Sequence, residues 1–379
     1  MNKRILIISG EASGDQHGAS LVTAVHQLNP EIQWVGMGGN KMREAGVDIR
    51  VDAGPLAVVG LIEVLRHIVP IYQAWKTLRN IIRNEPPDLL ILIDYPTFNL
   101  HIAKLAKKAG IKVLYYISPQ VWAWHRSRIK TIGKRVDKML VVFPFEEALY
   151  REKNVPVEYV GHPLAGEVHA DKSAQVMREE WNIPINARVI GLLPGSRKGE
   201  IERLLPTMLA AAAELKIQYP DLVFVLPLAN SLSITDIQPF LSANTVPVIV
   251  IPNQFYNTVQ LCEAVVVASG TATLEVALLE VPMVIIYKTA ASTYFLAKRL
   301  IQISHIGLCN IVADKEVVKE LIQQAATSQA ISAEISYILD DVDYREEIKN
   351  NLHAVKEKLG QGGGIKRAAE VVVDFLSCE

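Results

Sequence analysis

An acidic residue stands at the end of a run of five aliphatic residues. The stretch LLILIDYP, residues 89–96, places Asp94 directly after the run and Pro96 in the turn that follows. A continuous apolar run of this kind is typical of a parallel strand that is buried on both faces. A carboxylate at the end of such a strand is costly unless it has a partner or a chemical role. Asp94 therefore either caps the next helix or pairs with a distant arginine, or it is a general base whose pKa burial raises toward neutrality.

The segment SGEASGD, residues 9–15, follows an earlier apolar run. Its glycines allow a ligand to approach the backbone, and the helix that starts there attracts anions. The spacing is not GxGxxG, and the segment lacks the lysine of a P-loop. Glu11 and Asp15 would repel phosphate, so the segment is either a plain turn or a loop that binds sugar hydroxyls.

The segment LLPGSRKGEI, residues 192–201, has the residue types of a diphosphate site. Gly195 and Ser196 would expose backbone N–H groups after a buried strand. Arg197 can donate two parallel hydrogen bonds to phosphate oxygens. The alternative is a surface turn with a solvated arginine.

The segment SGTATLE, residues 269–275, opens a helix after another buried strand. The free N–H groups and the dipole of that helix favour an anion such as pyrophosphate. Glu275, one turn into the helix, is a candidate acceptor for ribose hydroxyls. Ser269 can at the same time be an ordinary N-cap.

These loops follow apolar runs that alternate with helical patterns along the chain. The runs are ILII at Ile5, WVGM at Trp34, LLILI at Leu89, VLYYI at Val113 and MLVVF at Met139, then RVIGLL at Arg188, LVFVLP at Leu222, VPVIVI at Val246, AVVVA at Ala264 and VPMVII at Val281. Repeated βα alternation predicts parallel sheets with helices on both faces. After about residue 315 we expect helices only.

The βα pattern restarts after a charged stretch between residues 163 and 187. We therefore expect an α/β protein with two Rossmann-like, doubly wound domains that face a cleft. The predicted boundaries are 1–165 and 166–345, and 346–379 is a helical C-terminal tail that packs on the N-terminal domain or on a partner subunit. Ligands of such sheets bind beyond the carboxyl ends of the strands, where the motif loops lie.

The composition narrows the class of protein. The 379 residues are 50% hydrophobic and 21% charged, with a formal net charge of -1, which does not favour nucleic acid as the main partner. The three cysteines, at 262, 309 and 378, are scattered, which predicts a reduced cytoplasmic protein without a structural zinc site. The initial run RILIIS is too short for a signal peptide. No apolar stretch reaches the about 18 residues of a transmembrane helix.

The order of the motifs resembles that of the lipid-A-disaccharide synthase family. SGEASGD, IDYPTFN, SPQVWAWHRSR, FPFE, GHP, LLPGSR and SGTATLE follow one another between Ile5 and about Gln323. LLPGSR and SGTATLE alone would resemble the wider class of UDP-sugar glycosyltransferases with the GT-B architecture of two Rossmann-like domains. SGEASGD and SPQVWAW make the resemblance more specific.

The resemblance implies an inverting transfer in lipid A biosynthesis. UDP-2,3-diacylglucosamine and 2,3-diacylglucosamine 1-phosphate would give a β-1,6-linked tetraacyl disaccharide 1-phosphate and UDP. The family uses no metal held by a DxD motif, and DDVD at 340–343 lies in the expected helical tail. The resemblance implies no cofactor. It does imply that two copies of the chain form a homodimer.

The resemblance also assigns site residues. Asp94 matches the catalytic base, Arg197 the arginine of the donor phosphates, and Glu11 a further catalytic carboxylate. The residues that match substrate-binding positions are Ser13, Gly14, Gly195, Ser196, Glu200, Ser269, Gly270, Thr271, Thr273, Glu275 and Asn310. The chain has Thr97 where related sequences often have a second aspartate.

Three other functions compete with this one. Another GT-B enzyme that uses UDP-GlcNAc, a transferase or an epimerase, would share the motifs of the second domain. A nicotinamide-dependent oxidoreductase would share the βα pattern but needs the missing fingerprint. A non-catalytic protein that binds a nucleotide sugar or a lipid would bind UDP without turnover.

Residues 57–83 combine apolar and basic side chains at helical spacing. The segment is either a helix packed in the core, which Pro70 splits, or an amphipathic segment on an anionic membrane surface. The acylated substrates favour the second interpretation, so we expect peripheral attachment to the inner membrane from the cytoplasm. The residues expected to reach the membrane or the acyl chains are Ile62, Leu65, Ile68 and Tyr72.

Two arginines that follow the apolar run VLYYI have two possible roles. Arg126 and Arg128, in SPQVWAWHRSR, either lie in solvent or bind the phosphate of the acceptor.

Overall fold

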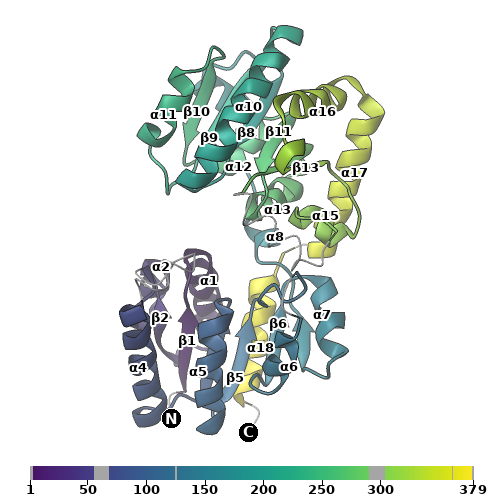
Figure 1. The fold of residues 1–379 in the computed structure, drawn as a ribbon. Coiled ribbons are helices and arrows are strands. Elements are labelled where there is room, and N and C mark those ends of the chain that lie inside the picture. The colour runs from purple at the N-terminus through teal and green to yellow at the C-terminus, as the bar shows by residue number, and fades with distance from the viewer. Residues whose placement is uncertain (1–2, 55–67, 124–125, 290–303, 361, 378–379) are drawn as a thin grey trace. The chain divides into compact units, whose positions relative to one another are not determined.

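A computed structural model describes residues 3–54, 68–123, 126–289, 304–360 and 362–377. The chain forms two compact units (Figure 1). The first unit contains Met1–Gly166 and Gly362–Glu379, and the second contains Glu167–Gln361. Of the expected tail 346–379, only the part from residue 362 onward therefore belongs to the first unit. Ile62 and Leu65 lie outside the described residues.

The first unit contains a parallel sheet of seven strands in the order β3-β2-β1-β4-β5-β6-β7. The strands are β1 (Arg4–Ser9), β2 (Gln33–Gly38), β3 (Asp48–Asp52), β4 (Leu89–Ile93), β5 (Lys112–Tyr116), β6 (Lys138–Val141) and β7 (Val157–Tyr159). The strand order reverses between β1 and β4. In the register of this pair Ser9 lies opposite Ile93, so SGEASGD and the loop of Asp94 leave the sheet side by side.

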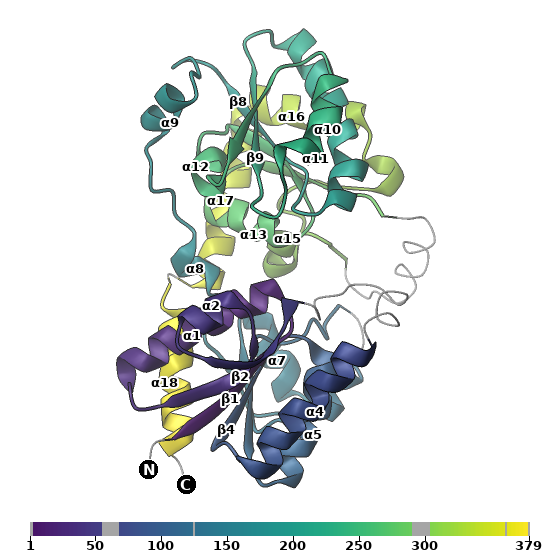
Figure 2. The same cartoon turned by 90° about the vertical axis from the view of Figure 1, so that its left-hand side faces the viewer.

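Helices cover both faces of this sheet. They are α1 (Ala12–Leu28), α2 (Asn40–Glu44), α4 (Ile68–Asn84), α5 (Pro96–Lys108), α6 (Arg128–Gly133), α7 (Pro144–Arg151) and α18 (Gly364–Ser377). Buried side chains of α4, α5, α6 and α7 share one core with the strands. The C-terminal helix α18 packs along α1 on the other face (Figure 2). The aliphatic strands are buried on both faces because helices cover each of them.

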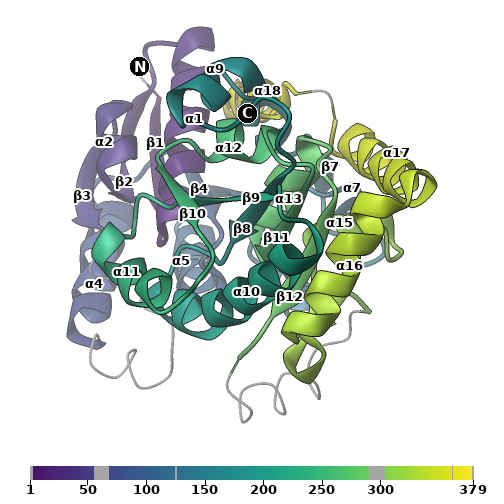
Figure 3. The same cartoon turned by 90° about the horizontal axis from the view of Figure 1, so that it is seen from above.

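The second unit repeats this pattern with six parallel strands in the order β10-β9-β8-β11-β12-β13 (Figure 3). They are β8 (Val189–Leu193), β9 (Val223–Leu228), β10 (Val248–Pro252), β11 (Ala264–Ala268), β12 (Met283–Tyr287) and β13 (Glu320–Ile322). Here the order reverses between β8 and β11, whose ends Leu193 and Val267 are paired. LLPGSR and SGTATLE follow these two strands.

The helices of the second unit extend from the unit boundary to residue 359. They are α8 (Leu164–Glu167), which spans that boundary, α9 (Ala174–Glu180), α10 (Lys198–Gln218), α11 (Ile234–Ser242), α12 (Phe255–Gln260), α13 (Thr271–Leu278), α15 (Leu308–Ala313), α16 (Ser328–Asp340) and α17 (Val342–Leu359), with a 3₁₀ turn at Gln323–Ala325. Helix α16 packs on α10 and on β11 and β12, while α17 packs on α13 and α15.

Three short strands of the structure were not predicted from the sequence. The strands β3, β7 and β13 all lie at sheet edges, where few residues are fully buried. Their sequences therefore lack the continuous apolar runs by which the central strands were recognised. The strand β13, at 320–322, shows that the expectation of helices only after residue 315 was wrong.

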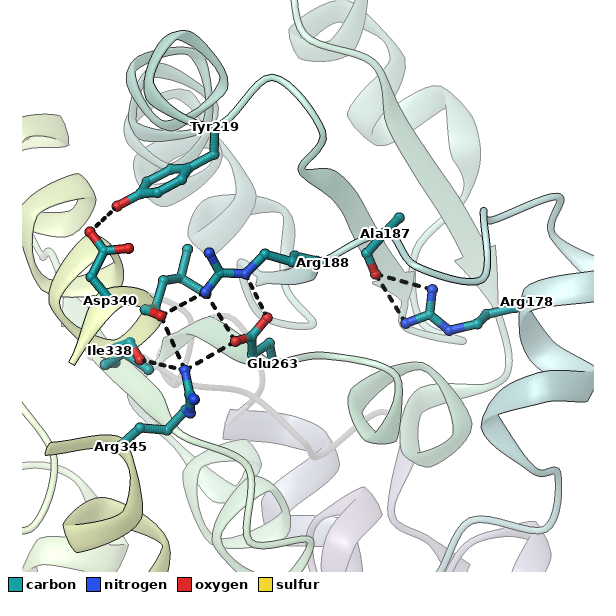
Figure 4. Close-up of polar contacts among 9 residues, drawn as sticks. Arg178, Ala187, Arg188, Tyr219, Glu263, Ile338, Asp340 and Arg345 are labelled. Atoms are coloured by element: carbon teal, nitrogen blue, oxygen red, sulfur yellow. Dashed lines mark hydrogen bonds and ion pairs between the residues drawn. The ribbon is translucent and has the colours of Figure 1, made fainter. Parts of the chain in front are cut away.

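A charged cluster ties the beginning of two central strands to the C-terminal helices of the second unit (Figure 4). Arg188, directly before β8, donates two hydrogen bonds to the carboxylate of Glu263, at 2.9 and 3.0 Å. Arg345 donates to the same carboxylate at 3.1 Å, and both arginines donate to the carbonyl of Leu339. One carboxylate therefore serves two guanidinium groups that are each largely shielded from solvent.

The substitution Glu263→Gln is expected to lower the free energy of unfolding by about 1–3 kcal/mol, because charge-assisted hydrogen bonds of two arginines lose their acceptor charge. Urea denaturation followed by circular dichroism measures the change. The control Glu346→Gln removes only an exposed ion pair with Lys349 and should cost under about 1 kcal/mol. Equal effects of the two substitutions would contradict this prediction.

Candidate functional site

The backbone turns sharply at Asp94. Asp94 and Tyr95 have φ values of 42° and 47°, so two consecutive residues with side chains adopt the left-handed conformation. This conformation is tolerated by aspartate but is unusual for a bulky residue, and each such residue costs on the order of 1–3 kcal/mol. Strain of this kind persists only where the surrounding structure holds it, and it is concentrated at functional sites.

Two buried side chains hold the strained turn. The Nδ2 atom of Asn99 donates to the carbonyl of Asp94 at 2.7 Å and to that of Ile93 at 3.1 Å. The hydroxyl of Tyr115, a fully buried residue of β5, also donates to the carbonyl of Asp94. The Asp94 side chain makes none of these bonds, so its carboxyl group is not used to cap α5.

The carboxyl group of Asp94 has the properties of a general base. Burial raises its pKa to about 6, and the negative charge of Glu11 contributes to the rise, while the backbone N–H of Tyr95 opposes it. Glu11 and Asp94 come from the two loops that flank the reversal of strand order. A carboxyl group whose pKa is raised beside a second carboxylate is typical of acid–base chemistry.

The glycines of SGEASGD are required by close packing. A Cβ atom on Gly10 would lie 2.4 Å from the ring of Tyr95, and one on Gly14 would lie 2.3 Å from the hydroxyl of Ser9. Gly10 therefore allows the Asp94 turn to pack against the loop. The side chain of Ser13 is exposed.

The second acid of this loop has a structural role. Asp15 is buried and accepts hydrogen bonds from the backbone N–H groups of Gly39, Lys41 and Met42, at 2.6, 3.1 and 3.2 Å. It thereby caps the start of α2. Because its oxygens already accept these hydrogen bonds, Asp15 supports the fold of the loop and is not available to a ligand.

In the second unit, the loops after β8 and β11 line a pocket with a volume of about 720 Å³. The predicted residues that line it are Gly195, Ser196, Arg197, Glu200, Ser269, Gly270, Thr271 and Glu275. Within the described part of the chain, no hydrogen bond occupies the backbone N–H groups of Thr271 and Ala272, at the start of α13. These groups can bind an anion.

The loop LLPGSR differs from the predicted cradle. Oε2 of Glu200 accepts from the backbone N–H groups of Ser196 and Arg197, at 2.9 and 3.3 Å. A Cβ on Gly195, which has a φ of 111°, would collide with the same carboxylate. The expectation that Ser196 exposes its N–H was therefore wrong. The mostly exposed guanidinium of Arg197 is the part of this loop that can reach an anion.

Two of the predicted binding residues are buried and make only internal hydrogen bonds. Thr273 donates to the carbonyl of Gly270 and accepts from the N–H of Leu308. Asn310 donates to the carbonyl of Val318 and to Glu320, and accepts from the N–H groups of residues 317 and 318. Both are fully buried, so they hold the loop after β11 and the segment beside it rather than touch a ligand.

Sequence reasoning missed a partner of Glu275. The hydroxyl of Tyr256, in α12, donates to Oε1 of Glu275 at 2.9 Å, and both residues line the pocket. Burial raises the pKa of Glu275, while the bond from Tyr256 opposes the rise. The tyrosine thus orients the carboxylate and favours its charged form, which accepts hydrogen bonds from hydroxyls. In the sequence, only the position of Tyr256 shortly after the strand β10 could have indicated that it belongs to the site.

The described residues contain no group of three or more His, Cys, Asp or Glu side chains that could hold a metal ion. Cys262 and Cys309 are both buried and unbridged.

Comparisons with known proteins agree with this arrangement. The sequence model of the family described as lipid-A-disaccharide synthetase matches residues 5–373. The chain is 52% identical to a lipid-A-disaccharide synthase of Geobacter sulfurreducens over 98% of this chain and 97% of that protein. It is 47% identical to one of Coxiella burnetii, over 99% of both chains.

Solved structures share the fold at low identity. The UDP-GlcNAc 2-epimerase of Neisseria meningitidis bound to UDP-GlcNAc has a TM-score of 0.62 and 15% identity, over 99% of this chain and 100% of that one. The glycosyltransferase of kitacinnamycin has a TM-score of 0.66 and 14% identity, over 98% of both chains. The expected architecture, two Rossmann-like sheets of the GT-B class with a helical C-terminal segment, is thereby confirmed.

The pKa of Asp94 is expected to fall below about 6 in Glu11→Gln, because the substitution removes a neighbouring negative charge. A ¹³C NMR titration of the aspartate carboxyl groups measures the shift. The control Glu85→Gln removes an exposed acid that pairs with Arg4, the first residue of β1, and it should leave the pKa of Asp94 unchanged. An unchanged titration in Glu11→Gln would show that the two carboxylates do not interact.

Proposed function

The chain belongs to the lipid-A-disaccharide synthetase family, and we propose how its two units divide the reaction of that family. It is a UDP-sugar glycosyltransferase of lipid A disaccharide synthesis. In the proposal the donor is UDP-2,3-diacylglucosamine and the acceptor is 2,3-diacylglucosamine 1-phosphate. The first unit contributes acid–base chemistry and acceptor binding, and the second binds the UDP part of the donor.

Asp94 is the proposed general base. Its carboxylate takes the proton of the acceptor 6-hydroxyl as that oxygen forms a bond to C1 of the donor sugar. The bond from C1 to the phosphate oxygen breaks on the opposite side, which inverts the anomeric centre and releases UDP. The observation that carries the proposal is the Asp94 carboxyl at the end of a central strand, with a pKa of about 6. A base with this pKa is largely deprotonated at neutral pH and still accepts a proton effectively.

Glu11, Ser13 and Gly14 are proposed to face the transferred sugar or the acceptor. Glu11 keeps the pKa of Asp94 raised and can accept hydrogen bonds from sugar hydroxyls. Its own negative charge excludes the diphosphate from this loop.

The pocket of the second unit is the proposed UDP site. Arg197 and the N-terminus of α13 would bind the diphosphate, where they neutralise the charge that develops on the leaving group. Gly195, Gly270 and Thr271 line the approach, and Glu275 accepts from the ribose hydroxyls. Glu200, Thr273 and Asn310 would act through the loops that they hold.

The alternative of an epimerase or another transferase for UDP-GlcNAc has no specific support. The solved epimerases are only 13–15% identical to this chain and share its fold. Relatives at 45–52% identity over nearly the full length are named lipid-A-disaccharide synthases.

The substitution Asp94→Asn is expected to lower kcat by about 10²–10⁴-fold while UDP binding is kept, because it removes the base alone. Asparagine is chosen because it tolerates a φ of 42°, which strains alanine. UDP release is measured with both lipids in neutral detergent, and UDP affinity by calorimetry. Arg197→Gln is the matched variant that should weaken UDP binding. Turnover by Asp94→Asn at the normal rate, or UDP release with UDP-GlcNAc and no acceptor, would refute the proposal.

Membrane attachment belongs to the same proposal. Val69 and Tyr72, on α4, are 59% and 62% exposed although they are apolar or aromatic. Arg79 stacks over Trp75 on the same helix, and Lys76 and Arg83 are exposed. Pro70 lies in the first turn of α4, where proline is tolerated, and residues 55–67, on its N-terminal side, lie outside the described part of the chain.

This face of α4 is the proposed contact with the cytoplasmic side of the inner membrane, where both lipids reside. Ile62, Leu65 and Ile68, whose side chains the structure does not describe, are included in the proposed contact from the sequence alone. Within the described residues no helix has the length and apolar content to cross a membrane. The family resemblance adds a second copy of the chain as a partner, and the proposal includes neither nucleic acid nor a cofactor.

The double substitution Val69→Ser with Tyr72→Ser is expected to reduce co-sedimentation with vesicles of anionic phospholipid several-fold, because it removes exposed apolar surface. Ile217→Ser, which alters an exposed isoleucine of α10, is the control and should not change binding. Unchanged binding by the double variant, with its thermal unfolding intact, would exclude α4 as the contact.

A further inference from the structure

We propose that Arg128 binds the anionic phosphate of the acceptor, in a subsite beside Asp94. The inference rests on the proposed function, since it assigns the acceptor as a phosphomonoester whose reacting hydroxyl lies at Asp94. It extends that function by naming the residue that recognises the phosphate of the acceptor.

The position of Arg128 follows from the loops beyond β4 and β5. Arg128 is the first residue of α6, and its Nη2 atom donates to the hydroxyl of Thr97 at 3.3 Å. Thr97 lies in the first turn of α5, three residues after Asp94. The guanidinium therefore lies at the same edge of the sheet as Asp94, and it contacts a residue that is within one helical turn of Asp94 along the chain.

A buried phenol lies near both charges. Burial raises the pKa of the Tyr115 hydroxyl, the negative charge of Asp94 adds to the rise, and the positive charge of Arg128 opposes it. The same hydroxyl donates to the carbonyl of Asp94. Asp94 and Arg128 therefore both lie near the hydroxyl of Tyr115, and they do not form an ion pair with each other.

Arg128 lacks the partner that arginines of this chain commonly have. In the described residues no carboxylate lies within ion-pair distance of its guanidinium, whereas Arg4, Arg151 and Arg188 each pair with a glutamate. Arg128 is half-buried, and a half-buried cation with only a neutral hydroxyl as partner is electrostatically unsatisfied. An aspartate at position 97 would supply the missing charge, and threonine leaves the cation available to a ligand.

The acceptor carries a phosphate that can pair with the guanidinium of Arg128. The carbon that bears its phosphate and the carbon that bears its 6-hydroxymethyl group both neighbour the ring oxygen, so a ring whose 6-hydroxyl meets Asp94 brings its phosphate into the surroundings of that carboxylate, where Arg128 can bind it. A guanidinium can donate two parallel hydrogen bonds to a phosphate, and the Thr97 hydroxyl can add a third. The subsite would both select phosphorylated acceptors and keep the phosphate away from the base.

Arg126 provides a matched control in the same segment. Its side chain is exposed, and its charge acts on Glu152 at the end of α7 rather than on the groups around Asp94. The segment thus offers two arginines, two residues apart, of which only one is assigned to the subsite.

The test compares two acceptors with the full-length protein in neutral detergent. One is 2,3-diacylglucosamine 1-phosphate, and the other is the methyl glycoside of 2,3-diacylglucosamine, which lacks the phosphate. We expect Arg128→Gln to raise KM for the phosphorylated acceptor by about 10–100-fold, as expected for the loss of charge-assisted hydrogen bonds, with little change for the methyl glycoside. Arg126→Gln should preserve the preference of the unaltered protein. Acceptor affinity is also measured by calorimetry, which needs no turnover.

A second variant guards against a folding defect. Thr97→Asp alters an exposed residue and places a carboxylate against Arg128, so it should reduce the preference for the phosphorylated acceptor in the same direction. The inference would be overturned if the unaltered protein showed no preference between the two acceptors. It would also be overturned if Arg128→Gln raised KM equally for both of them. An equal loss of preference in Arg126→Gln would also overturn it, because attraction would then be nonspecific. Absence of disaccharide from the unaltered protein would instead refute the proposed function, and acceptor calorimetry would still decide the role of Arg128.

Discussion

The reversal of strand order beside β1 and beside β8 is the constraint on which the candidate site residues of each unit depend. The strands on either side of such a reversal send their following helices to opposite faces of the sheet, so the two loops between strand and helix are left with open space between them. The first unit places SGEASGD and Asp94 in such a position, and the second places Arg197 and the start of α13 there. The same arrangement thus brings two carboxylates together on the first sheet, and an arginine and a helix N-terminus that can bind an anion on the second.

The function of each acidic residue is decided by the donors that surround it. Asp15 and Glu200 are saturated by backbone N–H groups, which makes them supports of α2 and of the loop after β8. Asp94 is held instead through its carbonyl, by Asn99 and Tyr115, so that the strained turn is fixed by bonds that do not use the carboxyl group. A rigid backbone that leaves the carboxyl group able to accept a proton is the arrangement that general base catalysis requires.

Support from outside the site is equally specific. Asn310 and Glu320 hold the segment beside the loop after β11, and Tyr256 holds Glu275. The cluster of Glu263 with its two arginines lies at the opposite ends of the strands, where it can stabilise the sheet without disturbing the pocket. Polar interactions in the second unit are thus separated into those that hold the pocket and those that hold the fold.

The sequence by itself determined the central strands, the two-sheet architecture and the loops that carry the chemistry. Short aliphatic runs that are bounded by turn residues and alternate with helical patterns favour strands buried between helices, and a carboxylate or arginine after such a run is visible without coordinates. Only the tertiary structure decided which polar groups are free. Whether Asp94 or Asp15 keeps its oxygens available depends on N–H groups about 24 residues or more away in the chain, and edge strands such as β13 depend on the neighbour that they pair with. Hydrogen-bond saturation is a property of spatial neighbours, and the spacing of residues along the chain does not contain it.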